Sequence, residues 1–198
     1  MLGDKRYCYP LTISDHRSRY LLCVDGLESV REDLAFPLFE RTFLEYGLPH
    51  AMRSDNGVPF AAPNSLFGLS KLAVWWLRLG IRLERIKPGH PEQNGRHERI
   101  HLTLKKQTVV PPAMDFLNQQ TKFDEFQEEY NNVRPHEALD MKYPAEIYKP
   151  SLRPYKGINR LDYPMHDRTV TVTSCGRICI KGLKINFSQV FAGHDVGI

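Results

Sequence analysis

Two acidic residues, Asp55 and Glu98, lie in local sequences that few kinds of fold produce. Asp55 follows a short apolar run and precedes Asn56-Gly57, a dipeptide that turns the backbone. We therefore expect its carboxylate at the exit of a strand. Glu98 follows a loop with turn residues, and the pattern over 96–107 predicts that it lies in the first turn of a helix.

Carboxylates at a strand end and at a helix start can serve as metal ligands. Their oxygens are the hard donors that Mg²⁺ takes, and two-metal sites use such ligands to hold attacking and leaving phosphate oxygens. Forty-two residues separate Asp55 from Glu98. The sequence predicts that both bind the same divalent metal centre.

Four short motifs follow one another along the chain. Residues 15–20 read Asp-His-Arg-Ser-Arg-Tyr, 53–57 Arg-Ser-Asp-Asn-Gly, 90–99 His-Pro-Glu-Gln-Asn-Gly-Arg-His-Glu-Arg, and 130–139 Tyr-Asn-Asn-Val-Arg-Pro-His-Glu-Ala-Leu. Tyr-Pro-Ala follows at 143–145. Taken in this order, the motifs resemble those of the DDE transposases and retroviral-type integrases, in particular bacterial insertion-sequence transposases with an integrase core. Each motif alone is a weak signal, whereas four in the family's order are strong.

The resemblance implies an α/β fold, the ribonuclease H-like integrase core, in which helices flank a mixed sheet. A small, incomplete all-β barrel would follow. We accordingly predict a catalytic core over 1–149, a proline-punctuated linker over 150–165 and a partial β domain over 166–198. Sequence patterns predict strands over 6–13, 20–24, 51–54 and 82–86, and helices over 30–46, 66–79, 96–107 and 116–130.

The same resemblance implies metal-dependent cleavage and transfer of DNA strands. Asp55, Glu98 and a further Asp would hold two Mg²⁺ or Mn²⁺ ions, one activating a water or a DNA 3′-OH and the other stabilising the leaving oxygen. Double-stranded DNA, both transposon ends and target, would be the partner, bound by a homo-oligomer. The candidate DNA-binding residues are Asn94, Arg96, Arg99, His101, Lys105 and Lys106.

The distribution of charge agrees with a nucleic-acid partner. The whole chain has a formal charge of +4, whereas residues 78–106 alone hold eight Lys or Arg and three Glu, a local +5. Phosphate contacts dominate nucleic-acid affinity, so a basic segment around the metal site suits a DNA-processing enzyme. The alternative is an ordinary solvated helix whose arginines form surface salt bridges.

The amino-terminal part departs from the family pattern. Only two strands are predicted before the first helix, where the family has three, so the first strand and its Asp would fall before Met1. Asp4 lies in a turn, and Asp15 matches a family position that is not catalytic. Both ends of the chain look cut, so we expect impaired strand transfer, with an inactive DNA-binding transposase remnant as an alternative.

A metalloprotease is the rival interpretation. His97-Glu98-Arg99-Ile100-His101 also fits His-Glu-x-x-His, in which two histidines four apart on a helix bind Zn²⁺ and the Glu acts as general base. The third ligand would be His136 or a Glu within 122–137. This interpretation leaves the residues before His97 and the motif around Asp55 unexplained.

The remaining features predict a cytoplasmic protein, and the resemblance implies a bacterial one that associates with the nucleoid when bound to DNA. No apolar run approaches the length of a membrane span, and the start lacks the pattern of a signal peptide. The four cysteines lack Cys-x-x-Cys spacing, which favours reduced, structural thiols: Cys8, Cys23, Cys175 and Cys179.

Overall fold

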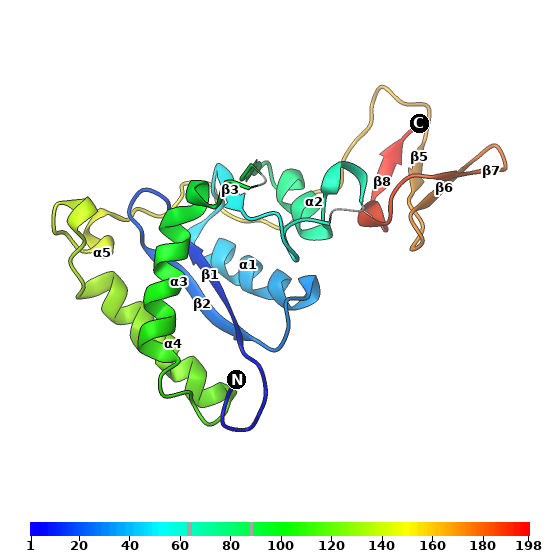
Figure 1. The fold of residues 1–198 in the computed structure, drawn as a ribbon. Helices are drawn as coiled ribbons and strands as arrows, with labels where there is room; N and C mark the ends of the chain where they lie inside the picture. Colours follow the sequence, from blue (N-terminus) through cyan, green and yellow to red (C-terminus); the bar gives the residue numbers. More distant parts are fainter. Residues whose placement is uncertain (63–64, 88) are drawn as a thin grey trace. The chain divides into compact units, whose positions relative to one another are not determined.

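The computed structural model describes residues 1–62, 65–87 and 89–198. The described chain forms two compact units. The first comprises Met1–Pro49 and Ile86–Tyr155, and the second His50–Arg85 and Lys156–Ile198 (Figure 1). Among the described helices, none combines the length and the apolar character needed to cross a bilayer.

An antiparallel strand pair lies at the centre of the first unit. β1 spans Tyr9–Ser14 and β2 spans Leu21–Leu27, with Thr12 opposite Val24 and an irregularity between Ile13 and Ser14. Both strands are rich in β-branched or apolar residues, and their inward positions are buried. Two strands therefore precede the first helix, as the sequence predicts.

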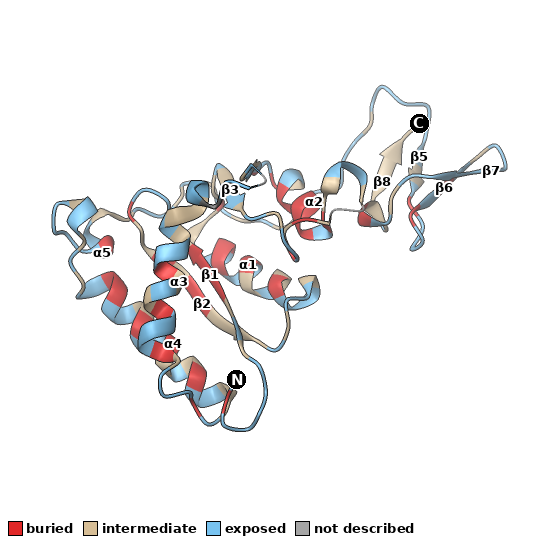
Figure 2. Cartoon of the chain, viewed as in Figure 1, coloured by how far each residue is buried: buried red, intermediate tan, exposed pale blue. Residues whose placement is uncertain are grey.

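Helices pack against this strand pair from both sides. α1 (Glu32–Tyr46) and α4 (Phe116–Asn132) both contact β2, and α3 (Gly95–Thr108) packs against α4. Figure 2 places the buried residues along the strands and on the facing sides of these helices. The core cluster comprises Leu21, Val24, Ile100, Leu104, Phe123, Phe126 and Tyr130. Because α3 and α4 are amphipathic, burying these side chains fixes which face of α3 remains exposed.

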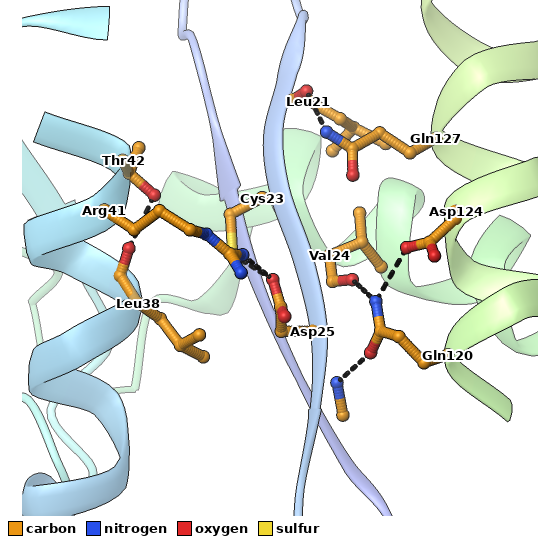
Figure 3. A network of polar contacts seen from close by, with 11 residues as sticks. Leu21, Cys23, Val24, Asp25, Leu38, Arg41, Thr42, Gln120, Asp124 and Gln127 are labelled. Atoms are coloured by element: carbon orange, nitrogen blue, oxygen red, sulfur yellow. Dashed lines mark hydrogen bonds and ion pairs between the residues drawn. The ribbon is translucent and has the colours of Figure 1, made fainter. Parts of the chain in front are cut away.

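The edge of β2 is covered by amide side chains of α4. Gln120 donates from Nε2 to the Val24 carbonyl at 2.9 Å and accepts from the Gly26 N–H at 3.0 Å. Gln127 donates to the Leu21 carbonyl at 3.0 Å (Figure 3). Side chains of α4 thus form the hydrogen bonds that a neighbouring strand would otherwise make with the main chain of β2. This protects the strand edge from pairing with another chain.

A polar cluster lies on the other side of β2, next to α1. Arg41 forms an ion pair with Asp25, and the Cys23 thiol donates to the same carboxylate at 3.0 Å (Figure 3). Burial, followed by the negative charge of Asp25, raises the pKa of Cys23. This thiol is therefore protonated and structural at neutral pH.

Short elements complete the first unit. The 3₁₀ helices η2 (Pro91–Asn94) and η3 (Glu137–Leu139) precede α3 and α5 (Pro144–Ile147), respectively. Gly47 ends α1 with a φ of 79°, and a side chain there would lie 2.8 Å from the Ser151 carbonyl oxygen. Ser151 in turn donates its N–H to the Tyr46 carbonyl at 2.9 Å. The first residues of the predicted linker therefore pack on α1.

A parallel strand pair organises the second unit. β3 (Ala51–Ser54) pairs with β4 (Arg82–Arg85), and the connection between them contains η1 (Leu66–Gly68) and α2 (Lys71–Arg78). Both predicted strands are confirmed, to within one residue. The single predicted helix over 66–79 is wrong, because the chain is extended at Leu69 and Ser70 between the two helices. Ser70 instead caps α2, its hydroxyl accepting from the Ala73 N–H at 3.1 Å.

The carboxyl-terminal residues of this unit form four short strands. β5 (Thr169–Thr171) pairs with β8 (Asp195–Gly197), and β6 (Arg177–Ile180) pairs with β7 (Leu183–Asn186). The 3₁₀ helix η4 (Gln189–Phe191) lies between β7 and β8. Within the described residues these are two separate antiparallel ladders.

Candidate functional site

Asp55 stands directly after β3, as the sequence predicts. It is exposed, and one carboxylate oxygen, Oδ1, accepts the Gly57 N–H at 3.0 Å. This Asx turn orients the carboxylate at the strand exit and turns the backbone away. Upstream, Arg53 forms an ion pair with Glu84 of β4 at 2.9 Å. The turn and the strand pairing together position Asp55.

Glu98 lies in the first turn of α3 and is exposed. The helix is held by Ile100 and Leu104, which are 5% and 1% exposed. Both pack in the core cluster, so Glu98 projects from a helix face whose orientation packing has fixed. A carboxylate in the first turn also interacts favourably with the helix dipole.

These two carboxylates are available to a hard cation. In the described part of the chain neither Asp55 nor Glu98 takes part in an ion pair. Asp55 belongs to the second unit and Glu98 to the first. Their sharing of a metal therefore stays a prediction.

His97 and His101 face β1 from the helix that carries Glu98. Their Nε2 atoms lie 3.1 Å apart, and Thr12 Oγ1 lies 3.1 Å from that of His97 and 2.8 Å from that of His101. Burial, and then the neighbouring His101, lower the pKa of His97 to about 4. His97 is therefore neutral at pH 7.

Five of the six candidate DNA-binding residues lie just before α3 or at its exposed positions, whereas His101 is half-buried and faces β1. Asn94 precedes the helix, and its side chain makes no capping bond. Arg96 donates to the His16 carbonyl at 3.0 Å, which holds its guanidinium against the β1–β2 loop. Arg99, Lys105 and Lys106 are exposed.

The salt-bridge alternative for these cations finds no support in the described residues. The ion pairs there involve other arginines and His90, but not Arg96, Arg99, Lys105 or Lys106. Such cations can contact phosphates without first breaking an ion pair.

Other motif residues have structural roles that the sequence did not disclose. Asp15 Oδ2 accepts from the N–H and the hydroxyl of Ser18 at 2.7 and 2.6 Å, closing the turn between β1 and β2. Tyr20 stacks on Tyr148 with ring centroids 4.4 Å apart. Asp4 pairs with Arg6 at 2.7 Å. Asp4 and Asp15 thus both already hold local structure.

The fourth motif joins α4 to the rest of the first unit. Asn131 is buried and bonds the main chain of Leu21, while the Tyr130 ring packs edge-on against His136 with centroids 4.6 Å apart. Burial is the main cause that lowers the pKa of His136. We therefore interpret this motif as a packing element.

The zinc-protease reading requires a third ligand beside His97 and His101. Across the described residues, no three His, Cys, Asp or Glu side chains are grouped so that they could hold a metal ion. Thr12 is instead the third polar group at this histidine pair. The alternation of β1 places Thr12 on the opposite face from Leu11 and Ile13, the face that it shares with its partner Val24, and no sequence motif marks it as a functional residue.

Comparisons with known proteins bear on both the sequence and the fold. Residues 79–144, about a third of the chain, match the family model described as the integrase core domain. A chain of the simian T-cell lymphotropic virus intasome, solved by cryo-EM in complex with PP2A regulatory subunit B56 gamma, has a similar fold, with a TM-score of 0.56. The two chains are 15% identical, and the match covers 91% of this chain and 64% of the other.

The family match includes β4, α3 with Glu98, α4 and the Tyr-Asn-x-x-Arg-Pro-His motif. The structural likeness at low identity independently supports the ribonuclease H-like fold. Together they support an integrase-type core as the fold of this chain, with residues 79–144 similar to the integrase core family.

Proposed function

We propose that this chain is the catalytic core of a DDE polynucleotidyl transferase, a bacterial insertion-sequence transposase, that cleaves and joins DNA strands. The observation that carries the proposal is Glu98: it lies in the first turn of α3, exposed, inside the segment that matches the integrase core family. Asp55, exposed after β3, supplies the second carboxylate.

The residues present fit the metal that this chemistry uses. Asp55 and Glu98 offer oxygen donors outside any described ion pair, the donor type that Mg²⁺ and Mn²⁺ prefer. When bound, two such ions lower the barrier to phosphodiester attack by stabilising charge on the attacking and leaving oxygens. The chain's own contribution is to hold the two carboxylates and to neutralise the DNA backbone with Arg99, Lys105 and Lys106.

A third carboxylate completes the proposed site. Asp4 and Asp15 are poor candidates because Arg6 and Ser18 already engage them. Under this proposal the chain as given joins DNA weakly, since two carboxylates provide too little negative charge to hold both ions.

Two measurements test the proposal. The first is Mn²⁺ binding by the folded chain: Asp55→Asn and Glu98→Gln should each weaken it by about tenfold or more, because each removes a charged ligand. Glu128→Gln, which removes an exposed carboxylate from α4, is the matched control and should leave binding unchanged. Equal Mn²⁺ affinity in all four proteins would refute the assignment of the two ligands.

The second measurement is joining of a pre-cleaved DNA end in Mn²⁺. We expect weak joining that Asp55→Asn and Glu98→Gln abolish. Robust joining lost on Asp4→Asn or Asp15→Asn would show that one of these residues completes the site. Robust joining that survives Asp55→Asn and Glu98→Gln would overturn the proposed function, and duplex binding without any joining or metal binding would favour the inactive remnant.

A further inference from the structure

Three polar atoms from β1 and α3 converge on one point in the first unit. The Nε2 atoms of His97 and His101 are 3.1 Å apart, and Thr12 Oγ1 is 3.1 and 2.8 Å from them. Every pair is thus within hydrogen-bonding distance. Thr12 is buried and both histidines are half-buried, so the cluster lies between the helix and the strand.

The three contacts cannot all be ordinary hydrogen bonds. A neutral imidazole Nε2 carries either one hydrogen or one lone pair, and the threonine hydroxyl carries one hydrogen. If neither histidine has its hydrogen on Nε2, the single hydroxyl hydrogen must serve three contacts. If one has it there, two hydrogens must serve three contacts. If both have it there, the two N–H groups face each other and the hydroxyl has no nitrogen acceptor. No protonation state therefore satisfies the whole triangle.

A divalent transition metal removes this shortage of hydrogens, because the Nε2 lone pairs of both histidines can then point at one cation. The two Nε2 atoms are 3.1 Å apart. With Zn–N bonds of about 2.0–2.1 Å, they would subtend about 100° at the metal, which is close to the tetrahedral angle. Histidines four apart on a helix supply such a pair in known zinc sites. Thr12 Oγ1 and water are then oxygen donors for the remaining positions.

We propose that His97 and His101, with Thr12 at the third corner, form a binding site for a divalent transition metal of the zinc class. Imidazole nitrogen selects Zn²⁺, Co²⁺, Ni²⁺ or Cu²⁺ over Mg²⁺, which prefers oxygen. The site is therefore distinct from the carboxylate site of the proposed function and independent of it. It also differs from the protease reading, because Glu98 is exposed and no third His, Cys, Asp or Glu ligand accompanies the pair among the described residues.

The bound metal would fasten α3 to β1. Thr12 belongs to the strand and both histidines to the helix, so a cation held by all three links the two elements. Anything that binds only the folded state raises its stability by mass action. Zn²⁺ should therefore raise the melting temperature of the chain, and Mg²⁺ at the same concentration should not do so through this site.

Titration of the metal-free full chain with Zn²⁺, and with Co²⁺ followed by its visible absorption, tests the site. We expect one equivalent bound with micromolar affinity, weakened about tenfold or more by His97→Gln or His101→Gln and less by Thr12→Val. His90→Gln, which changes an exposed histidine bonded to Glu92, is the control and should bind as the unaltered chain does. Absence of a stoichiometric site, or unchanged affinity in both histidine variants, would overturn the proposal.

X-ray absorption of the unaltered chain loaded with one Zn²⁺ keeps the proposal testable if those variants fail to fold. The expected coordination shell contains nitrogen and oxygen only, with the multiple-scattering signature of two imidazoles. A shell with sulfur would assign the ion to the exposed thiols of Cys175 and Cys179 and would refute the site.

Discussion

Asn131 bonds both main-chain groups of Leu21: its Oδ1 accepts the Leu21 N–H at 2.8 Å, and its Nδ2 donates to the Leu21 carbonyl at 2.9 Å. Both residues are buried. The asparagine of the Tyr-Asn-x-x-Arg-Pro-His motif thus takes the place of a neighbouring strand at the start of β2. Together with Gln120 and Gln127, it makes one face of α4 the cover of that strand edge.

Replacing Asn131 with Ala should destabilise the chain by about 2 kcal/mol, because it leaves a buried N–H without a partner. The Leu21 carbonyl would still accept from Gln127, whereas no other side chain of α4 accepts from the Leu21 N–H among the described contacts. Urea unfolding measures the change. Asn132→Ala, at the exposed neighbouring position, should stay within about 0.5 kcal/mol of the unaltered chain. Equal stability of the two variants would contradict this role.

The pH dependence of stability should include a contribution from His136. Burial, together with Arg19 and Arg134, lowers its pKa below the ordinary 6.5. In the unfolded chain the imidazole gains its proton as the pH falls through 6.5, while the folded chain still holds the neutral form. The contribution of His136 to the free energy of unfolding should therefore be fully present above pH 6.5. It should decrease as the pH falls below 6.5.

The comparison of His136→Phe with the unaltered chain isolates this contribution. The variant should lose less stability between neutral pH and mildly acidic pH, whereas His90→Gln, at an exposed histidine, should follow the unaltered chain. A steeper acid loss in His136→Phe would show that the sign is wrong.

The exposed and the buried free thiols should differ in reactivity. Cys175 and Cys179 are exposed, and the hydroxyl of Thr173 lowers the pKa of Cys175, whereas burial raises that of Cys23. A thiol reagent at neutral pH should therefore modify Cys175 and Cys179 first and Cys23 about 100-fold more slowly. Mass spectrometry of the modified peptides measures the order. Removal of the fast phase by Cys175→Ser and Cys179→Ser is the control, and early modification of Cys23 would contradict the buried placement.

Local patterns in the sequence predict most of the first unit. The helices predicted over 96–107 and 116–130 correspond to α3 and α4 to within two residues at each end, because the 3.6-residue period of buried positions is strong in both. The acidic side chains between the aromatic residues of α4 are exposed. The positions of Asp55 at a strand exit and of Glu98 in a first turn followed from turn and helix signals in the same way.

Features that depend on contacts between distant residues could not be predicted. Thr12 lies 85 residues from His97, and Asn131 lies 110 residues from Leu21, so no local period links either pair. The break in the chain before α2 could not be predicted from the sequence for a different reason. Leu66 to Leu79 is apolar enough to continue as a helix, but Phe67 has a φ of 54° and Ser70 starts a new helix as its cap. A serine inside a helical pattern can cap or continue it, and its conformation decides which.

The exposed cations of α3 should make duplex DNA binding depend steeply on salt. Arg99, Lys105 and Lys106 lie outside the described ion pairs, and residues 78–106 carry a local charge of +5. Each phosphate contact releases counterions and contributes about −0.9 to the slope of log affinity against log salt concentration. Replacing Lys105 and Lys106 together with Gln should therefore weaken binding for all sequences alike and reduce the slope by about 2.

The control removes the same charge elsewhere on the first unit. Lys142→Gln with Lys149→Gln also lowers the net charge by two at exposed positions, but both residues lie outside α3. If α3 contacts the phosphates, this control variant should keep nearly the full slope of log affinity against log salt concentration. Charges that lie away from the bound DNA attract it at long range but do not replace its bound counterions. Fluorescence anisotropy of a labelled duplex at about 50 and 200 mM salt gives both slopes. Equal losses in the two double variants would mean that net charge, and not the α3 surface, governs binding, and salt-independent affinity would exclude phosphate recognition altogether.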